Sequence, residues 1–319
     1  MSEIVLVTGG AGFIGAPTVA RLLDAGHEVV VVDNFSVGSL ERLAPLRRHK
    51  ALDIVELDLR DAKGTAVAVG EIGARSVIHL AAHHFIPFCK AHPADTIDVN
   101  VGGTQHLLDA LVPVAPERVL FASTADVYAA APFPHVETDP TEPDNIYGMS
   151  KLMGERLMQF HSERAPKTDV VNVRFFNAVG PGETNPHLVP DILDHVRAGD
   201  ELPLGNTDTR RDYVHTEDMA EALARLLGGP DGSFTVNLGT GVSWDATDIV
   251  HFMAQLLDRT LVINTDPAKV RRSDRQNLQA SARRLEMLLP GFRTKSLRET
   301  LASTLSAEGF ALAPAAVPA

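Results

Sequence analysis

Short runs of apolar residues recur along the first 180 residues of the chain. They are rich in valine, isoleucine and leucine, have the length of a strand, and occupy residues 4–7, 29–32, 77–81, 119–122 and 170–173. Strands that are apolar on both faces are typical of a parallel sheet that helices cover on both sides. Amphipathic helical patterns separate these runs. The alternation predicts an α/β fold with a doubly wound parallel sheet and right-handed crossovers.

Three stretches carry the helical spacing. Residues 18–25 end at Gly26, a common helix stop, and residues 103–112 end before Pro113. Residues 147–161 place Leu152, Leu157 and Phe160 on one shared side. These patterns predict helices between the strands of the sheet.

The texture of the chain changes after about Asn177, where proline and glycine become denser and short strands alternate with helices. We therefore expect a nucleotide-binding domain over residues 1–176. Residues 177–310 are expected to form mainly a smaller C-terminal α/β part that binds substrate, with some segments returning to the first sheet. Residues 311–319 are rich in alanine and proline and are expected to fray.

Charge and composition restrict the partners. The 319 residues carry 29 Lys and Arg against 41 Asp and Glu, a net charge of −12, which disfavours nucleic acid and anionic membranes. No apolar run reaches the roughly 20 residues that cross a bilayer, and no signal peptide is evident. Cys89 is the single cysteine, so an internal disulfide and a cysteine-built zinc site are excluded. We expect a cytoplasmic protein in which Cys89 is a buried, unreactive residue.

A glycine-rich turn follows the first predicted strand and opens the first helix. Its spacing is Gly9-x-x-Gly12-x-x-Gly15, and Asp33 ends the second strand 18 residues after Gly15. The glycines permit a sharp turn and a close approach of a pyrophosphate, and the helix N-terminus supplies amide donors. The acidic residue suits the adenosine ribose hydroxyls and repels a 2′-phosphate. This context predicts a Rossmann domain that binds NAD rather than NADP.

Tyr147 and Lys151 begin a later helix and share one of its faces. A phenol titrates at about 10 and is a weak base at neutral pH, but a nearby cation lowers its pKa. Such a pair alone is common on helix surfaces. Ser123 and Thr124 strengthen the interpretation, because they end a strand at the edge of the sheet where ligands gather. A hydroxyl there can share a proton network with Tyr147.

Motifs along nearly the whole chain, about residues 3–305, resemble the extended short-chain dehydrogenases/reductases. Within that group the chain is similar to the NAD-dependent epimerase/dehydratase family, which acts on nucleotide sugars. The resemblance rests on the glycine turn, Asp33-Asn34, His79-Leu80-Ala81-Ala82, Asn100, Ser123-Thr124-Ala125-Asp126-Val127-Tyr128, Tyr147-x-x-Ser150-Lys151, Arg174-Phe175-Phe176-Asn177, Gly180-Pro181-Gly182, Arg211-Asp212-Tyr213-Val214, Asn237-Leu238-Gly239 and Arg271-x-x-Asp274.

The resemblance implies three sets of site residues. Catalysis is assigned to Thr124, Tyr147 and Lys151. NAD binding is assigned to Gly9, Gly12, Phe13, Ile14, Gly15, Asp33, Asn34, Asp58, Leu59, Leu80, Ala81, Ala82, Asn100, Tyr147 and Lys151. Substrate binding is assigned to Ser123, Thr124, Asp126, Asn177, Leu188, Val189, Arg211 and Arg271. On spacing alone, Asp58 fits a solvated turn as well as the adenine edge, and Arg211 fits a surface position.

The family mechanism begins when Tyr147 removes the proton of the sugar 4-hydroxyl while the C4 hydride passes to NAD⁺. Lys151 lowers the tyrosine pKa, Thr124 binds the reacting oxygen, and the 4-keto intermediate takes the hydride back on its other face. The resemblance also implies a homodimer and a nucleotide-sugar substrate, most simply a UDP-sugar. Dehydratases of the family carry an Asp-Glu pair after the threonine, whereas this chain has Ala125-Asp126. This difference favours a 4-epimerase; a dehydratase or decarboxylase is the alternative, and a non-catalytic NAD-binding regulator is a remote one.

Two segments depart from the family pattern. Ala178-Val179 replaces Val-Tyr, and the loop from His83 to Cys89 is bulky and aromatic where relatives carry small polar residues and an arginine. The second departure predicts an altered sugar pocket, for a substrate less polar than UDP-glucose or differently substituted. His83 and His84 face opposite ways in an extended segment, and no third ligand lies at a suitable spacing. We therefore predict no metal site.

Overall fold

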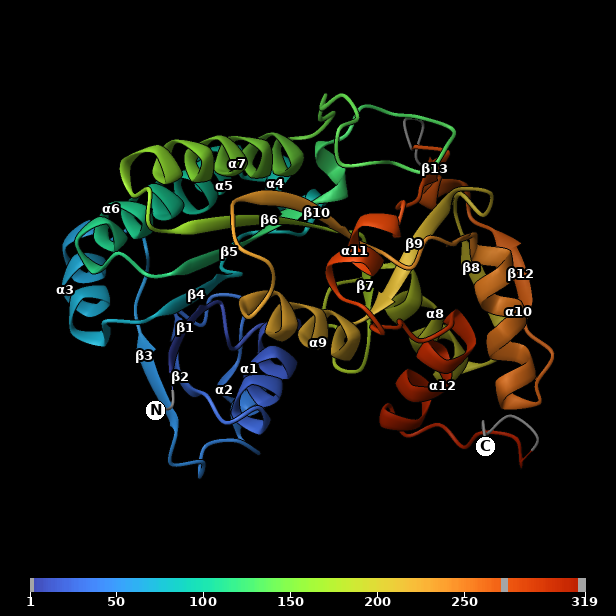
Figure 1. Ribbon diagram of the computed structural model, residues 1–319. Coiled ribbons are helices and arrows are strands. Elements are labelled where there is room, and N and C mark those ends of the chain that lie inside the picture. The colour runs from blue at the N-terminus through green and yellow to red at the C-terminus, as the bar shows by residue number, and fades with distance from the viewer. Residues whose placement is uncertain (1–2, 271–274, 315–319) are drawn as a thin grey trace.

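Seven parallel strands form the central sheet of the computed structural model, which describes residues 3–270 and 275–314 (Figure 1). The hydrogen-bonded order is β10 (Phe234–Leu238), β6 (Asp169–Phe175), β5 (Arg118–Thr124), β4 (Ser76–His79), β1 (Ile4–Thr8), β2 (Glu28–Asp33) and β3 (Leu52–Glu56). The chain runs outward from β1 in both directions. This topology confirms the predicted doubly wound α/β fold.

Helices cover both faces of the sheet (Figure 1). One face packs against α3 (Ala62–Ile72), α6 (Thr104–Val114) and α7 (Ile146–Arg164), and the other against α1 (Gly15–Asp24), α9 (Thr216–Leu227) and α11 (Arg283–Leu288). Leu120 of β5 and Leu22 of α1 are fully buried in the second of these layers. Each such side chain stabilises the fold by about 1.5–3 kcal/mol relative to exposure.

A smaller α/β part, to the right in Figure 1, is built from later segments. Strand β9 (Arg210–His215) pairs with β7 (Asn177–Val179), β11 (Ser243–Trp244) and β13 (Asn277–Leu278), while β8 (Glu201–Leu204) pairs with β12 (Val262–Thr265). Helices α8 (Leu188–Ala198), α10 (Ala246–Leu257) and α12 (Leu297–Ala307) enclose a separate core with Ile192, Met253 and Leu301. None of the helices in the described ranges has the length and hydropathy to cross a bilayer.

The chain returns to the first sheet after Asn177, through α9 and β10. Residue 176 is therefore only the first point at which the chain passes from one part to the other. The proposed boundary between two domains at this residue remains a prediction. The tail differs from the expectation of fraying in the part that the structure describes. The Ala313 N–H donates to the Leu256 carbonyl at 2.8 Å, and Leu312 packs against the C-terminal core, so both are held in place.

Two helices differ from their predicted form. Helix α6 continues through Pro113 and ends at Val114, before Ala115 with a φ of +49°. Pro113 has no N–H to donate to the Asp109 carbonyl, and the helix ends one residue later. On the predicted apolar side of α7, Leu152 and Leu157 are half-buried against the core, whereas Phe160 is 53% exposed. Gly154 faces the sheet instead, and a Cβ there would lie 2.4 Å from the Phe121 ring. The missing side chain lets α7 approach β5 closely.

Candidate active site

The glycine turn between β1 and α1 forms a close-packed backbone cradle. Gly9 has a φ of +72°, and a Cβ there would lie 2.7 Å from the Ala81 nitrogen. A Cβ on Gly15 would lie 2.2 Å from the Gly9 oxygen. Ile14 precedes α1 without a capping side chain, and the first turn has no acidic residue. No acidic side chain in the first turn of α1 therefore competes for its backbone amides, the donors that a dinucleotide pyrophosphate requires.

Asp33 ends β2 beside this cradle. Its carboxylate accepts hydrogen bonds from the Ala11 N–H at 3.0 Å and the Phe35 N–H at 2.9 Å, and the residue is 7% exposed. Burial raises its pKa, and the two backbone hydrogen bonds act in the opposite direction. These contacts hold the carboxylate at the end of the strand, where a ribose hydroxyl donor fits and a second phosphate does not.

Asn34 and Asp58 join the ends of β2 and β3. Asn34 donates to Asp58 at 2.8 Å, and Arg60 holds the pKa of Asp58 well below its usual range. Asp58 is therefore fixed and ionised at the sheet edge, and its place beside an adenine remains a prediction. Leu59 is 8% exposed and packs against Gly103, so its side chain belongs to the core.

Asn100 connects the segment after β4 to α7. It lies on a π-helical turn, η1 (Asp98–Gly103), a distortion that often marks functional sites. Its amide donates to the His83 carbonyl and to the Ser150 hydroxyl, both at 2.9 Å, and accepts from the His83 N–H at 2.8 Å. Both amide protons are thus used within the protein. Asn100 therefore ties the backbone at His83 to Ser150 of α7, and its part in NAD binding remains a prediction.

The predicted catalytic side chains meet where β5 ends against the start of α7. Asn145 caps this helix by accepting from the Gly148 N–H at 2.9 Å. Thr124, the last residue of β5, lies beside Tyr147, and its hydroxyl donates to the Asp126 carboxylate at 3.3 Å. Lys151 is 3% exposed, and its Nζ lies 4.9 Å from the centre of the Phe121 ring. The fold therefore brings Thr124, Tyr147 and Lys151 together at the carboxyl end of β5.

The electrostatics of this triad differ from the expected ones. Burial raises the pKa of Tyr147, the Asp126 carboxylate raises it further, and the neighbouring Thr124 hydroxyl lowers it. Burial lowers the pKa of Lys151 to about 7, and its amine lies over the Phe121 ring. The pKa of Tyr147 is therefore raised, whereas the sequence predicts that Lys151 lowers it.

Lys151 should therefore cost stability. Because its pKa falls from 10.5 in the unfolded chain, the penalty is complete below pH 7 and disappears above pH 10.5. We expect Lys151→Met to stabilise the fold, by about 2 kcal/mol more at pH 6 than at pH 9. Urea unfolding at both pH values measures this difference. The exposed Lys90→Met is the control and should show no such pH dependence; equal effects of Lys151→Met at both pH values would contradict the burial argument.

Ser123 turns away from Thr124, because neighbouring residues in a strand face opposite sides. Its hydroxyl donates to Glu155 at 2.5 Å, and Glu155 pairs with Arg174 through two contacts of 2.8 Å. Both charged side chains are 7% exposed. Ser123 thus has a buried partner, and its contact with substrate remains a prediction. No motif in the sequence pointed to Glu155, which lies on α7 one turn beyond Lys151.

The predicted phosphate ligands lie around Asp126. Arg211 donates to the Arg275 carbonyl at 2.8 Å and acts electrostatically on Asp126, whereas Arg210 pairs with Asp245 at 2.9 Å. Arg275 is 8% exposed and donates to the Asp126 carbonyl at 3.3 Å. Burial raises the pKa of Asp126. Arg271, also predicted to bind substrate, lies outside the described residues.

The remaining predicted substrate residues lie at the entrance of the C-terminal part. Asn177 begins β7, at the position paired with Tyr213 of β9. Leu188 and Val189 begin α8, and Val189 is buried in the C-terminal core. Packing therefore accounts for Val189, and its contact with a nucleobase remains a prediction. Cys89 is fully buried, as predicted.

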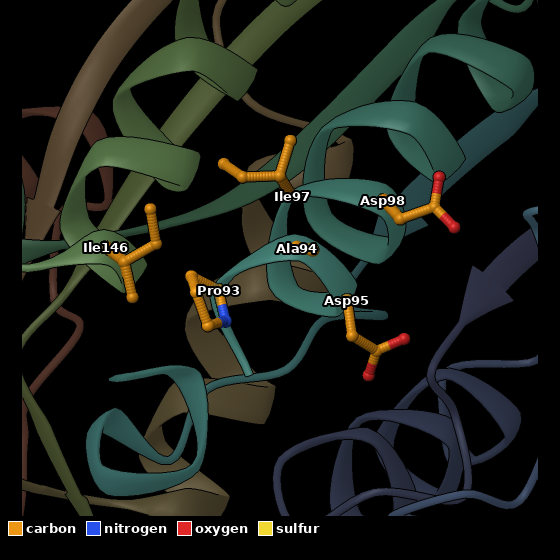
Figure 2. Close-up of a pocket in the computed structure, with 6 residues that line it drawn as sticks. All are labelled: Pro93, Ala94, Asp95, Ile97, Asp98 and Ile146. Atoms are coloured by element: carbon orange, nitrogen blue, oxygen red, sulfur yellow. The ribbon is translucent and has the colours of Figure 1, made fainter. Parts of the chain in front are cut away.

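A surface depression of about 760 Å³ lies outside this constellation (Figure 2). Figure 2 shows Ile97 of α5 (Pro93–Ile97) on one side and Ile146 of α7 on the other. Asp95 and Asp98 also line it. Two carboxylates disfavour a diphosphate, so the depression does not fit the substrate that the motifs predict.

A phosphate-binding glycine turn beside a tyrosine–lysine pair, at the carboxyl edge of a parallel sheet, defines a dinucleotide-binding enzyme of the short-chain dehydrogenase type. The family model described as NAD dependent epimerase/dehydratase matches residues 5–239. A UDP-glucose 4-epimerase of Lacticaseibacillus casei is 30% identical over 306 residues, 89% of this chain and 90% of that protein. The chain therefore belongs to the NAD-dependent epimerase/dehydratase family, as its motifs predict.

Solved structures agree with this assignment. The UDP-glucose 4-epimerase of Thermus thermophilus, in complex with NAD, is 29% identical, with a TM-score of 0.85 over 96% of this chain and 99% of that chain. The UDP-glucose 4-epimerase of Bifidobacterium longum, in complex with NAD⁺ and UDP, is 27% identical, with a TM-score of 0.86 over 96% and 98% of the two chains.

Proposed function

We propose that this protein is an NAD-dependent UDP-sugar 4-epimerase. The observation that carries the proposal is that Thr124, at the end of β5, lies beside Tyr147 at the start of α7, one helical turn from the buried Lys151. The family membership and the epimerase relatives support it. When bound, NAD accepts a hydride from the sugar C4 and returns it.

Tyr147 takes the proton of the sugar 4-hydroxyl in this proposal, and Thr124 binds the same oxygen. Proton removal is possible only when positive charge reaches the phenol, because burial raises the tyrosine pKa. Lys151 supplies that charge when it is protonated. Gly9, Gly12, Gly15, Phe13 and Ile14 would hold the pyrophosphate. For the nucleoside diphosphate we propose Asn177, Leu188, Arg211 and Arg271.

A second candidate activity rests on Asp126. Its raised pKa and its position beside Tyr147 would allow it to donate a proton, as a dehydratase requires. Ala125 supplies no second carboxylate, which favours the epimerase.

Incubation with UDP-glucose, UDP-N-acetylglucosamine and UDP-glucuronate, followed by chromatography and mass spectrometry, distinguishes these activities. A product of unchanged mass and inverted C4 supports the epimerase; loss of water or carbon dioxide, or no turnover, would contradict it.

The proposed cofactor preference predicts the behaviour of Asp33→Asn. This change removes the charge that repels a 2′-phosphate and keeps one of the two oxygens that accept backbone N–H bonds. We expect the ratio of NADPH to NADH affinity to rise by about 10–100-fold, the value of one charged contact. Titration with both reduced cofactors measures the ratio. Asp53→Asn, on exposed β3, is the control, and an unchanged ratio in Asp33→Asn would contradict the role.

We also propose a cytoplasmic homodimer. Met149, Met153 and Phe160 lie on α7 and are 49%, 51% and 53% exposed, and Ile97 is exposed nearby. Such a cluster of large apolar side chains is typical of a protein interface. Light scattering coupled to size-exclusion chromatography tests this proposal: a mass near twice 34.3 kDa supports it, and a monomer at micromolar concentration contradicts it. The proposed cytoplasmic location is supported by Cys89, a free buried cysteine, because the cytoplasm keeps thiols reduced.

A further inference from the structure

Two histidines and a glutamate meet outside the catalytic triad. One ligand atom each from His84, Glu183 and His187 lies within 4.8 Å of the others. His84 belongs to the bulky segment that follows β4. Glu183 and His187 belong to the segment between β7 and α8, about a hundred positions later in the chain. The sequence analysis missed this cluster because His84 has no partner at a metal-binding spacing.

Neighbouring residues orient the three side chains. The ring of His187 packs edge-to-face on Phe85, with centroids 5.4 Å apart. Asn185 lies between the other two: its Nδ2 is 3.1 Å from His84 Nε2 and 3.2 Å from Glu183 Oε1. The Asn185 backbone N–H also donates to Glu183 at 2.8 Å. The His84 ring and the Glu183 carboxylate therefore both point at the Asn185 amide nitrogen. A cation would take the position of that nitrogen.

His83, by contrast, is directed elsewhere. Its Nε2 lies 3.0 Å from Asp95, and its backbone is bound by Asn100. The two adjacent histidines thus face different surroundings, as an extended segment requires. His84 alone is available to the cluster.

We propose that His84, Glu183 and His187 bind a divalent cation, with zinc as the best-fitting ion. Two imidazoles and one carboxylate are a common protein ligand set for zinc, which keeps a fourth position for water or another ligand. Tetrahedral donors lie about 3.3 Å apart when each is about 2.0 Å from the metal. Small side-chain rotations, with displacement of the Asn185 amide, bring the present donors to that geometry.

The cation would join the segment after β4, which holds His84, to the segment between β7 and α8, which holds Glu183 and His187. Both segments follow strand ends on the side of the sheet that holds Thr124, Tyr147 and Lys151. The charge of Lys151 acts on His84, so the two groups are near one another. A bound ion would therefore fix one wall of the candidate sugar pocket and add positive charge to it. This role is separate from hydride or proton transfer, so the site can be tested without turnover.

Zinc titration of the chelator-treated, full-length protein tests the proposal. We expect one tight site in the wild type, and an affinity at least tenfold lower in Glu183→Gln and in His187→Ala. Zinc should also raise the melting temperature of the wild type and not that of these variants. Both positions are chosen because they are less buried than His84, so the variants should fold. Circular dichroism verifies that they do.

His195→Ala is the matched control, because His195 lies on α8 outside the cluster and bonds to the Asp191 carbonyl. It should keep the tight site. Cobalt in place of zinc should give a visible spectrum that the wild type and His195→Ala share and that His187→Ala lacks. Absence of a tight site in the wild type, or equal affinity in all four proteins, would overturn the proposal. Since binding is the readout, it stands or falls independently of the epimerase activity.

Discussion

Tyr147→Phe is expected to lower kcat about 10²–10⁴-fold, the usual contribution of a positioned proton-transfer group. The variant keeps the ring and its packing and removes only the hydroxyl that lies beside Thr124. Stability should therefore change little, and NADH affinity should stay within a few-fold. Steady-state turnover of a UDP-sugar and a cofactor titration on the same preparation separate the two effects.

Tyr128→Phe is the matched control for loss of a buried phenol. The Tyr128 hydroxyl donates to Asn237 at 2.6 Å and lies in a separate apolar cluster. We expect this variant to lose stability, by about 1 kcal/mol for one hydrogen bond, and to keep most of its turnover. If Tyr147→Phe retained wild-type turnover while Tyr128→Phe did not, the assignment of the base would be wrong.

The sheet and its dinucleotide cradle could be predicted because local signals specify them. Apolar runs identified β1, β2, β4, β5 and β6, and the glycine spacing located the turn whose crowding at Gly9 and Gly15 excludes side chains. The strand-end positions of Asp33 and Thr124 followed from the same pattern. In each case the residues that determine the feature are close in sequence, so periodicity and spacing contain the information.

The partners of these residues could not be predicted, because they come from distant segments. Ser123 finds Glu155 on a helix, and His84 finds Glu183 across about a hundred positions. The apolar side predicted for α7 was wrong at Phe160, which is exposed, and it omitted Gly154 and Lys151. Close packing on Phe121 selects those two residues, which hydropathy does not identify. Tertiary contact overrides the local pattern here.

The ionisation of Tyr147 and Lys151 was also not predictable from the sequence. A lysine four residues from a tyrosine suggests a lowered phenol pKa, yet both groups are buried, and burial disfavours their charged forms. Burial of Lys151 therefore should reduce stability, and the charge that favours the tyrosine anion is present when Lys151 is protonated.

Glu155→Ala should have the largest effect on stability, about 3–5 kcal/mol, because it leaves Arg174 as a buried charge without its carboxylate. It also removes the acceptor of the Ser123 hydroxyl. Urea unfolding at neutral pH measures the loss. Asp109→Ala, which breaks the exposed pair with Arg164, is the control and should cost about 1 kcal/mol or less.

The double variant Glu155→Met, Arg174→Met distinguishes the two origins of this effect. If the loss comes from the uncompensated guanidinium, removing both charges should restore most of the stability, because apolar replacement of a buried pair is often neutral. If it comes instead from the packing of α7 on β5, the double variant should be as unstable as Glu155→Ala. A loss of under about 1 kcal/mol in Glu155→Ala would contradict the buried-charge argument itself. Restored stability in the double variant would therefore show that Glu155 of α7 serves to neutralise Arg174 rather than to hold the helix in place.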